Sequence, residues 1–454
     1  MLFFSVIPQA AAGGGDPLVS ATVEDCEKTA LENHRSVQLA AREIRLHQAR
    51  QTEAFRNLLP FLTLKGEETQ GKADDAGRTP EFTEKSFGVE LVQPLFQGGR
   101  LFRAFQQSRE NLEAVRAKLE RARQEAVYRA RVAYWNLARA EKVLQIWIRH
   151  LEKLEKQKTM ADRLLEAHVI TPQDYMAVNT RYLQAHYQAD GARAEVELRL
   201  WQWTESLGMK TPPQLRPQAD FGAVSVRTDT LEDCLNLARV RHPDIRLQQA
   251  VFEAARRGHQ GAKARHWPQI DLNGFYGKSG AAFKGEILTL KDDWQAGVRA
   301  SLQFGGSTLQ ASGLRQRTSP RIGQSSTTES QTLSASVGIL DGLKSRAEEK
   351  EAWLEHHAAQ AQMESVEMDV LNGVREAYAD MREILAQLKI DENELALALT
   401  EVSVAEIRSS RREGAVSERA ASLARLAQAE EALTQSQAAH AVSLAALDRA
   451  VGHE

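Results

Sequence analysis

The sequence predicts a mainly helical protein with membrane β-strands, built as a tandem-duplicated unit of long coiled-coil helices plus β-hairpins. Three observations support this fold class. Residues 100–168 contain no proline, and their apolar side chains recur at steps of three and four, as one face of a helix requires. Other segments alternate apolar and polar residues, as strands do, and the same residues recur at a fixed offset in the two halves of the chain. At 1.5 Å per residue, the helix over residues 100–168 is roughly 100 Å long, the scale of a coiled-coil strut.

Composition excludes two classes of protein. The 454 residues are 42% hydrophobic and 26% charged, and the mean hydropathy of -0.44 excludes a polytopic helical membrane protein. Lys and Arg number 58 and Asp and Glu number 61, with both signs interleaved, so no basic surface indicates nucleic acid. Because no run of 18 apolar residues occurs, any membrane crossing has to consist of strands.

Residues 1–15 resemble the remnant of a secretory signal. Leu2, Phe3 and Phe4 are apolar, and Ala10-Ala11-Ala12 suits signal-peptidase cleavage, although no basic leader precedes them. The alternative is a frayed apolar terminus. We expect a clipped or mis-started signal peptide.

The chain divides into two repeats, residues 16–210 and 229–454, joined by a proline-containing linker over residues 211–228. Thr22-Val23-Glu24-Asp25-Cys26 returns as Thr230-Leu231-Glu232-Asp233-Cys234, at an offset of 208 residues. Each copy opens with a capping box, which predicts a helix start. The first helix is expected to continue to about Leu58.

After Pro60 and the equivalent Pro268, the period changes from helical to alternating. The clearest strand covers residues 294–304, and weaker signals cover residues 62–64, 87–91 and 270–276. Nine to eleven residues with one apolar face is the length that a tilted strand needs to cross a bilayer. A half-buried strand of a soluble sheet gives the same alternation, so the pattern alone leaves both readings open.

The second repeat contains an insertion near residues 305–340. Beyond the strands, equivalent residues lie 244 positions apart rather than 208, for example Ala133-Tyr134 and Ala377-Tyr378. Leu333, Ala335, Val337 and Ile339 alternate with polar residues, which predicts an extra hairpin with residues 307–317 as its outgoing strand. A loop rich in Ser, Thr and Gln with one redundant strand is the alternative.

Each long helix is expected to end in a tight turn followed by a return helix. In the first turn, Thr171 is placed as N-cap and Pro172 at the first helical position. In the second, Gly414 ends one helix and Ser417 caps the next.

The order of these elements resembles the TolC family of outer-membrane efflux proteins. The carrying residues are Gln93-Pro94-Leu95-Phe96-Gln97-Gly98-Gly99-Arg100, supported by Leu59-Pro60 and Leu207-Gly208, and the resemblance runs from Thr22 to Gly452. It implies a homotrimer in the outer membrane, in which a shared β-barrel joins a periplasmic α-barrel. Such a protein is the passive exit duct of a tripartite efflux or type I secretion system. Four strands per subunit give a ring of twelve, which the inserted hairpin could raise.

The resemblance also implies partners and a gate. The partners are outer-membrane lipid, a periplasmic adaptor and, through the adaptor, an inner-membrane RND or ABC transporter. The family closes its tips by polar links between an Asp and an Arg; here Asp174 matches the Asp, whereas Val416 stands at the Arg position. The candidate residues for the tip gate and adaptor contact are Val169, Asp174, Arg411, Arg412, Gly414 and Arg419. Alternatively, Asp174 is only a first-turn carboxylate that the helix dipole favours.

No pattern indicates an enzyme, a metal site or a cofactor. HExxH, Gly-x-Ser-x-Gly and phosphate-loop motifs are missing, and His356-His357 diverge on a helix. Cys26 and Cys234 could pair in an oxidising compartment, but two small buried residues are the expected reading. The competing functions are a soluble or peripheral coiled-coil scaffold and a periplasmic adaptor. Strand lengths argue against the scaffold, and the full duplication argues against the adaptor.

Overall fold

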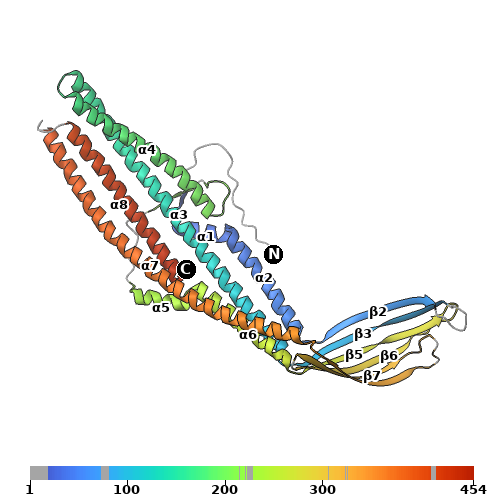
Figure 1. Cartoon of the computed structure of the whole chain (residues 1–454). Helices are drawn as coiled ribbons and strands as arrows, with labels where there is room; N and C mark the ends of the chain where they lie inside the picture. Colours follow the sequence, from blue (N-terminus) through green and yellow to red (C-terminus); the bar gives the residue numbers. More distant parts are fainter. Residues whose placement is uncertain are drawn as a thin grey trace. The chain divides into compact units, whose positions relative to one another are not determined.

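The computed structural model describes residues 19–72, 81–213, 215–219, 221, 229–304, 306–322, 324, 326–410 and 416–453. The expected signal remnant, residues 1–15, lies outside them. The chain forms two compact units (Figure 1). Unit 1 comprises Met1–Leu39, Glu120–His242 and Val370–Glu454, and unit 2 comprises Ala40–Leu119 and Pro243–Asp369. Each unit therefore combines segments of both repeats.

The short helices at the start of each repeat correspond closely. They are α1 (Val23–Asn33) and α2 (Arg35–Arg56) in the first repeat and α5 (Leu231–Arg241) and α6 (Pro243–Lys263) in the second. The hydroxyl of Thr22 accepts from the Asp25 N–H at 3.3 Å, and the Asp25 carboxylate accepts from the Thr22 N–H at 3.2 Å. Thr230 and Asp233 make the same two bonds, which confirms both capping boxes.

The expectation of one unbroken helix to Leu58 was wrong. His34 caps α1 with extended backbone angles, φ −66° and ψ 124°, so α1 and α2 are separate helices. His242 does the same between α5 and α6. In the second repeat the break has a clear cause, because Pro243 disfavours helical geometry in the residue before it.

The long helices run close to their predicted bounds, but Ser417, expected as the N-cap of the last helix, is its second residue. They are α3 (Arg100–Glu166, 67 residues), α4 (Pro172–Ser206), α7 (Leu343–Ser410, 68 residues) and α8 (Val416–Val451). Two short strands, β1 (Val19–Ala21) and β4 (Leu215–Pro217), pair in parallel, and a 3-10 turn, η2, covers Ala264–His266. None of the helices in the described part of the chain combines the length and apolar composition that a bilayer-crossing helix needs.

Unit 1 contains two equivalent hydrophobic cores, one from each repeat. The first includes Cys26, Ala30, Ala130, Leu137, Trp203 and Leu207. The second includes Cys234, Ala238, Val374, Met381, Leu447 and Val451, at the two offsets found in the sequence. The two cysteines are buried thiols that no disulfide joins. Burial raises the pKa of Cys26 to about 11, as expected for a thiol used as a small core residue.

A third cluster in unit 1 joins the two repeats. It combines Trp147 and Leu154 of α3 with Val178 of α4 and Leu423 of α8. Alanines fill the space between α4 and α8, namely Ala185, Ala189, Ala192, Ala420 and Ala427. Because alanine is small, these helix backbones can approach closely. The duplicated halves are thus held together by packing between α3, α4 and the first part of α8.

Unit 2 contains one six-stranded antiparallel sheet. Its strands are β2 (Phe61–Lys72), β3 (Glu81–Gln97), β5 (Gln269–Phe283), β6 (Lys291–Phe304), β7 (Ser307–Thr318) and β8 (Thr328–Gly338). The order is β2-β3-β5-β6-β7-β8, so β2 and β8 are the edges. Strands β7 and β8 pair along their length. The insertion therefore forms the extra hairpin rather than the alternative loop.

Candidate functional site

One face of the sheet carries apolar side chains on all six strands, although Arg315 and Arg317 also lie on it towards the end of β7. The register aligns Leu64 with Val89 and Val89 with Tyr276 in the first strands. On the same face of the last two strands, it aligns Leu309 of β7 with Val337 of β8. Leu64 and Leu333, on the two edge strands, are both 85% exposed. A face this apolar and this exposed is suited to lipid rather than to water.

The opposite face is polar. Across four neighbouring strands, the register aligns Asp271 of β5, Arg299 of β6, Ser312 of β7 and Ser334 of β8. The hydroxyl oxygens of Ser312 and Ser334 lie 2.7 Å apart. On the β2 and β3 side, Lys65 and Glu90 form an ion pair at 2.7 Å. The sheet can therefore separate lipid on one side from water on the other.

Aromatic side chains mark both ends of the apolar face. The end of the sheet at which β5 connects to β6 and β7 connects to β8 is called the loop end, and the opposite end, where strands connect to helices, the helix end. Tyr276 pairs with Trp294 near the loop end, and the Arg315 guanidinium lies 5.9 Å from the centre of the Trp294 ring. At the helix end, Phe304 and Phe96 are exposed. Between Trp294 and Phe304, the same face of β6 carries only Ala, Val and Leu. Two aromatic rows around an apolar band are typical of strands that cross an outer membrane.

A buried carboxylate fixes the chain segment that follows β7. Asp293 of β6 is 6% exposed. It accepts a hydrogen bond from the Ser319 N–H at 2.5 Å and further bonds from the hydroxyls of Ser279 and Ser319. Two residues on, Arg321 lies 3.9 Å from Glu84 of β3. The end of the extra hairpin's first strand is thus tied to β3, β5 and β6.

The first helical tip is closed by local hydrogen bonds. His168 has φ 55°, and the Val169 N–H donates to the Leu164 carbonyl at 2.8 Å, which ends α3. The Thr171 hydroxyl accepts from the Asp174 N–H at 3.1 Å, and Pro172 is the first residue of α4. Both capping assignments are confirmed. Val169 is 66% exposed at the turn.

The second tip meets the first through a serine. Ser417 donates its hydroxyl to Oδ1 of Asp174 at 3.2 Å, while the Thr171 hydroxyl donates to Oδ2 at 2.8 Å. Arg419, one of the candidate tip residues, forms an ion pair with Glu406 at 3.4 Å. The remaining candidates, Arg411, Arg412 and Gly414, lie outside the described residues.

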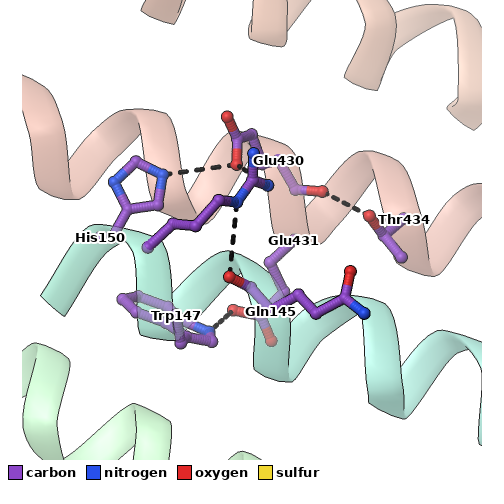
Figure 2. Close-up of polar contacts among 7 residues, drawn as sticks. Gln145, Trp147, His150, Glu430, Glu431 and Thr434 are labelled. Carbon is purple, nitrogen blue, oxygen red and sulfur yellow. Dashed lines mark hydrogen bonds and ion pairs between the residues drawn. The ribbon is translucent and has the colours of Figure 1, made fainter. Parts of the chain in front are cut away.

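A polar cluster joins α3 of the first repeat to α8 of the second (Figure 2). The indole N–H of Trp147 donates to Glu431 at 3.0 Å. His150 is 1% exposed, and its Nε2 lies 3.4 Å from Glu430, which Arg149 approaches at 3.3 Å. The hydrogen bond to His150 holds the pKa of the Glu430 carboxyl below its usual value despite partial burial, with help from nearby cations.

Comparison with known proteins identifies the family. Residues 28–208 and 234–453 both match the family model described as outer membrane efflux protein. The chain belongs to the outer membrane efflux protein family. A search of curated proteins found no significant match.

The fold of this efflux protein is shared with solved outer-membrane channels. The CmeC outer membrane channel of Campylobacter jejuni is 14% identical, covers 98% of this chain and 93% of its own, and superposes with a TM-score of 0.75. The MtrE outer membrane channel of Neisseria gonorrhoeae, described in its open state, is 17% identical. The match covers 95% of this chain and 89% of MtrE, with a TM-score of 0.72. The VceC outer membrane protein of Vibrio cholerae is 14% identical. The match covers 95% of this chain and 96% of VceC, with a TM-score of 0.73.

Family membership decides between the functions that the sequence left open. The protein is an outer-membrane efflux channel with a periplasmic extension, and not a soluble scaffold or an adaptor. The alternating segments are membrane strands, and the soluble-sheet reading is set aside. Among the described residues, no group of three or more His, Cys, Asp or Glu side chains could hold a metal ion.

Sequence reasoning missed Ser417 as a partner of Asp174, and it missed both Asp293 and the pair of Glu430 and His150. Only part of a signal existed for the last pair, because His150 falls one step from Trp147 on the apolar stripe of α3. A histidine inside such a stripe calls for a polar partner. Its partner is 280 residues away, which periodicity within one helix cannot reveal.

Proposed function

We propose that three copies of this chain assemble into a passive exit duct, with the apolar face of the sheet against lipid and the polar face around an aqueous lumen. The observation that carries the proposal is a sheet with one apolar and one polar face. Its two edge strands, β2 and β8, each pair on one side only within the described part of the chain. No catalytic step is involved. Such a duct selects by its width and by the charge of its wall.

Closure by other copies follows from the solvent. In lipid, each unpaired backbone group costs several kcal/mol, so a sheet with free edges is stable only when further strands complete it. The helices also offer contact surfaces, because α4 and α7 carry exposed apolar side chains. These are Leu183, Tyr187, Leu198, Ile390, Leu397 and Leu399. Lateral association of α4 in one copy with α7 in the next covers them.

The helical tips are proposed to contact a periplasmic adaptor, through which an inner-membrane RND or ABC transporter supplies energy. Val169 and Met176 are both 66% exposed beside the turn and provide an apolar contact for the adaptor. The proposed gate is the link between Asp174 and Ser417, which ties the tip of one repeat to that of the other. Arg411, Arg412, Gly414 and Arg419 complete the proposed tip surface.

Cell fractionation tests the duct. Protein expressed in a Gram-negative host is expected in the outer-membrane fraction, soluble only after detergent extraction, with the mass of three chains by native mass spectrometry. The purified trimer should conduct ions across planar bilayers. Recovery from the aqueous fraction as a single folded copy would overturn the proposal and favour a coiled-coil scaffold.

Tip variants test the gate. Asp174→Ala removes the acceptor of Ser417, and Ser417→Ala removes the donor, so both are expected to raise single-channel conductance several-fold. The matched control is Glu197→Ala, which removes an exposed carboxylate from the same helix far along from the tip. Equal conductance in all three variants and the parent would show that the link does not close the duct.

A further inference from the structure

The extra hairpin changes which strand lies at the edge of the sheet. Without it, β6 would be the second edge; with it, β6 pairs with β5 on one side and β7 on the other, and β8 becomes the edge. Resting on the proposed trimer, we infer that β8 of each copy pairs with β2 of the next, so that three six-stranded sheets form a wall of eighteen strands. This wall is wider than the ring of twelve that four strands per copy give.

The hairpin belongs to the wall because, in the half nearest the helices, it continues the two-faced pattern. Beyond Gly313 and Leu333, the same face of the hairpin carries charged and polar residues, namely Arg315, Arg317, Glu329 and Gln331. On the apolar face, Leu302 of β6 pairs with Leu309 of β7, which pairs with Val337 of β8. On the polar face, Ser301 pairs with Gln310, which pairs with Ser336. A hairpin lying outside the membrane wall would have no need for this alternation.

The hairpin is also held at both ends. Near the loop end, Ser319 binds the buried Asp293 carboxylate. Near the helix end, the Gly342 N–H donates to the Gly306 carbonyl at 2.8 Å, where the chain leaves β8 for α7. Peeling the hairpin away to free β6 would break these contacts together with the whole ladder between β6 and β7.

The two edges fit each other in direction. All neighbours in the sheet are antiparallel, and the number of strands is even, so β2 and β8 run in opposite directions. An antiparallel pair thus forms when one copy meets the next. Strand β2 starts at the end of α2, and β8 ends shortly before α7, so both meet helices on the same side. Phe61 and Gly338 are therefore expected at the same level.

The two edge strands also match in which residues lie on the apolar face and which lie on the polar face. Leu62 and Leu64 share the apolar face of β2 with Val89 and Leu91 of the next strand, whereas Thr63 lies on the polar face. In β8, Leu333 and Val337 lie on the apolar face, and Ser334 and Ser336 lie on the polar face. Pairing Thr63 with Ser336 therefore keeps lipid-facing residues of both copies on one side.

The width of the wall bears on the cargo. Barrel diameter rises about linearly with strand number, so eighteen strands enclose roughly twice the cross-section of twelve. The added strands present uncharged polar groups to the lumen, namely Gln310, Ser312, Thr332, Ser334 and Ser336. The added strands thus widen the lumen for a large hydrated cargo without adding charge to its wall.

Cysteine cross-linking across the seam tests the inference. Thr63→Cys is combined with Ser336→Cys in detergent-solubilised trimers in which Cys26 and Cys234 are replaced by Ala. Oxidation is expected to convert most of the protein into covalent trimers, because each copy is then linked to both neighbours. Thr63→Cys with Ala335→Cys is the matched control, because Ala335 lies on the opposite face of the sheet and should not react.

A second pair distinguishes the alternatives. Thr63→Cys with Gln303→Cys probes a seam made by β6, with the hairpin outside the wall. Cross-linking of this pair, without that of Thr63 and Ser336, would overturn the eighteen-stranded wall while leaving the trimeric duct intact. A protein that yields no trimer in any pairing and remains in the aqueous fraction would overturn the proposed function itself.

Deleting the insertion gives an independent measurement. Removal of residues 305–340 joins Phe304 to Asp341-Gly342, which resembles Phe96-Gln97-Gly98 in the first repeat. The Gly306 and Gly342 backbones are already hydrogen-bonded, so the new connection has little distance to span. The shortened trimer is expected to link Thr63 with Gln303, and cryo-electron microscopy should count twelve strands against eighteen in the parent. Equal counts would contradict the inference.

Discussion

The two repeats of this efflux protein differ little in their helices and greatly in their strands. Helices α1 and α5 have 11 residues each, α3 and α7 have 67 and 68, and α4 and α8 have 35 and 36. In contrast, the first repeat contributes two strands to the sheet and the second contributes four. The difference shows which part of the unit tolerates insertion.

Packing explains the constancy of the helices. The equivalent cores place Ala30 and Ala238, Leu137 and Met381, and Leu207 and Val451 in corresponding positions. An insertion inside a helix would rotate every later side chain off its core face. A hairpin, however, returns the chain to the end of the sheet from which it left, so the next helix starts in the same place.

Truncation of a core side chain should cause the largest loss of stability, and it tests whether the two cores are equivalent. Trp203 and Leu447 occupy equivalent places, and both are 0% exposed. Trp203→Ala is expected to destabilise by about 3–5 kcal/mol and Leu447→Ala by about 2–5 kcal/mol, because each leaves a cavity. Thermal unfolding in detergent, followed by circular dichroism, measures both. Trp201→Ala, at a 57% exposed position of the same helix, is the control and should change little.

The glycines before the long helices should respond unequally. Gly98 has φ 58°, and a Cβ there would lie 2.6 Å from the Ala264 carbonyl oxygen. At the equivalent Gly342, the nearest atom would be 3.1 Å away, and φ is not in the left-handed region. Gly98→Ala should therefore cost about 1–3 kcal/mol, and Gly342→Ala less. Equal shifts of the unfolding midpoint would show that the two turns are under the same strain.

The capping boxes should respond equally. Thr22→Ala and Thr230→Ala each remove one helix cap and are expected to cost about 1 kcal/mol. Because the two caps share no partner, the double variant should show the sum of the single effects. Thr→Ser at either place retains the hydroxyl and serves as control. An unequal pair of midpoints would reveal a difference between the repeats that the cap geometry does not show.

The smallest effect concerns pH. Since the pKa of Glu430 is lowered in the folded protein, its carboxylate stabilises the fold above the ordinary glutamate pKa of 4.5. That contribution is lost as the pH falls through the lowered value. Glu430→Gln should therefore lower the unfolding midpoint at pH 7 and converge with the parent under acidic conditions. Glu394→Gln, at the exposed second-repeat position equivalent to His150, should show no such convergence.

Much of the fold could be predicted because its signals are local. The capping boxes, the turn at Thr171-Pro172 and the alternation of residues 294–304 all depend on neighbours within a few residues. The break at His34 was not predicted, because in the first repeat no proline marks it. The tip was only partly predicted: the sequence indicated Asp174, but Ser417, its partner, lies 243 residues away.

The sequence by itself determined the duplication, the long helices and the two-faced strands, because periodicity and repeated motifs survive without knowledge of long-range contacts. Only the tertiary structure decided that the inserted segment joins the sheet as β7 and β8, that β8 is the edge, and that Glu430 meets His150. These features depend on pairings between residues far apart in the chain. Such pairings are chosen by the register of the whole sheet and by the packing of entire helices, which no local pattern specifies.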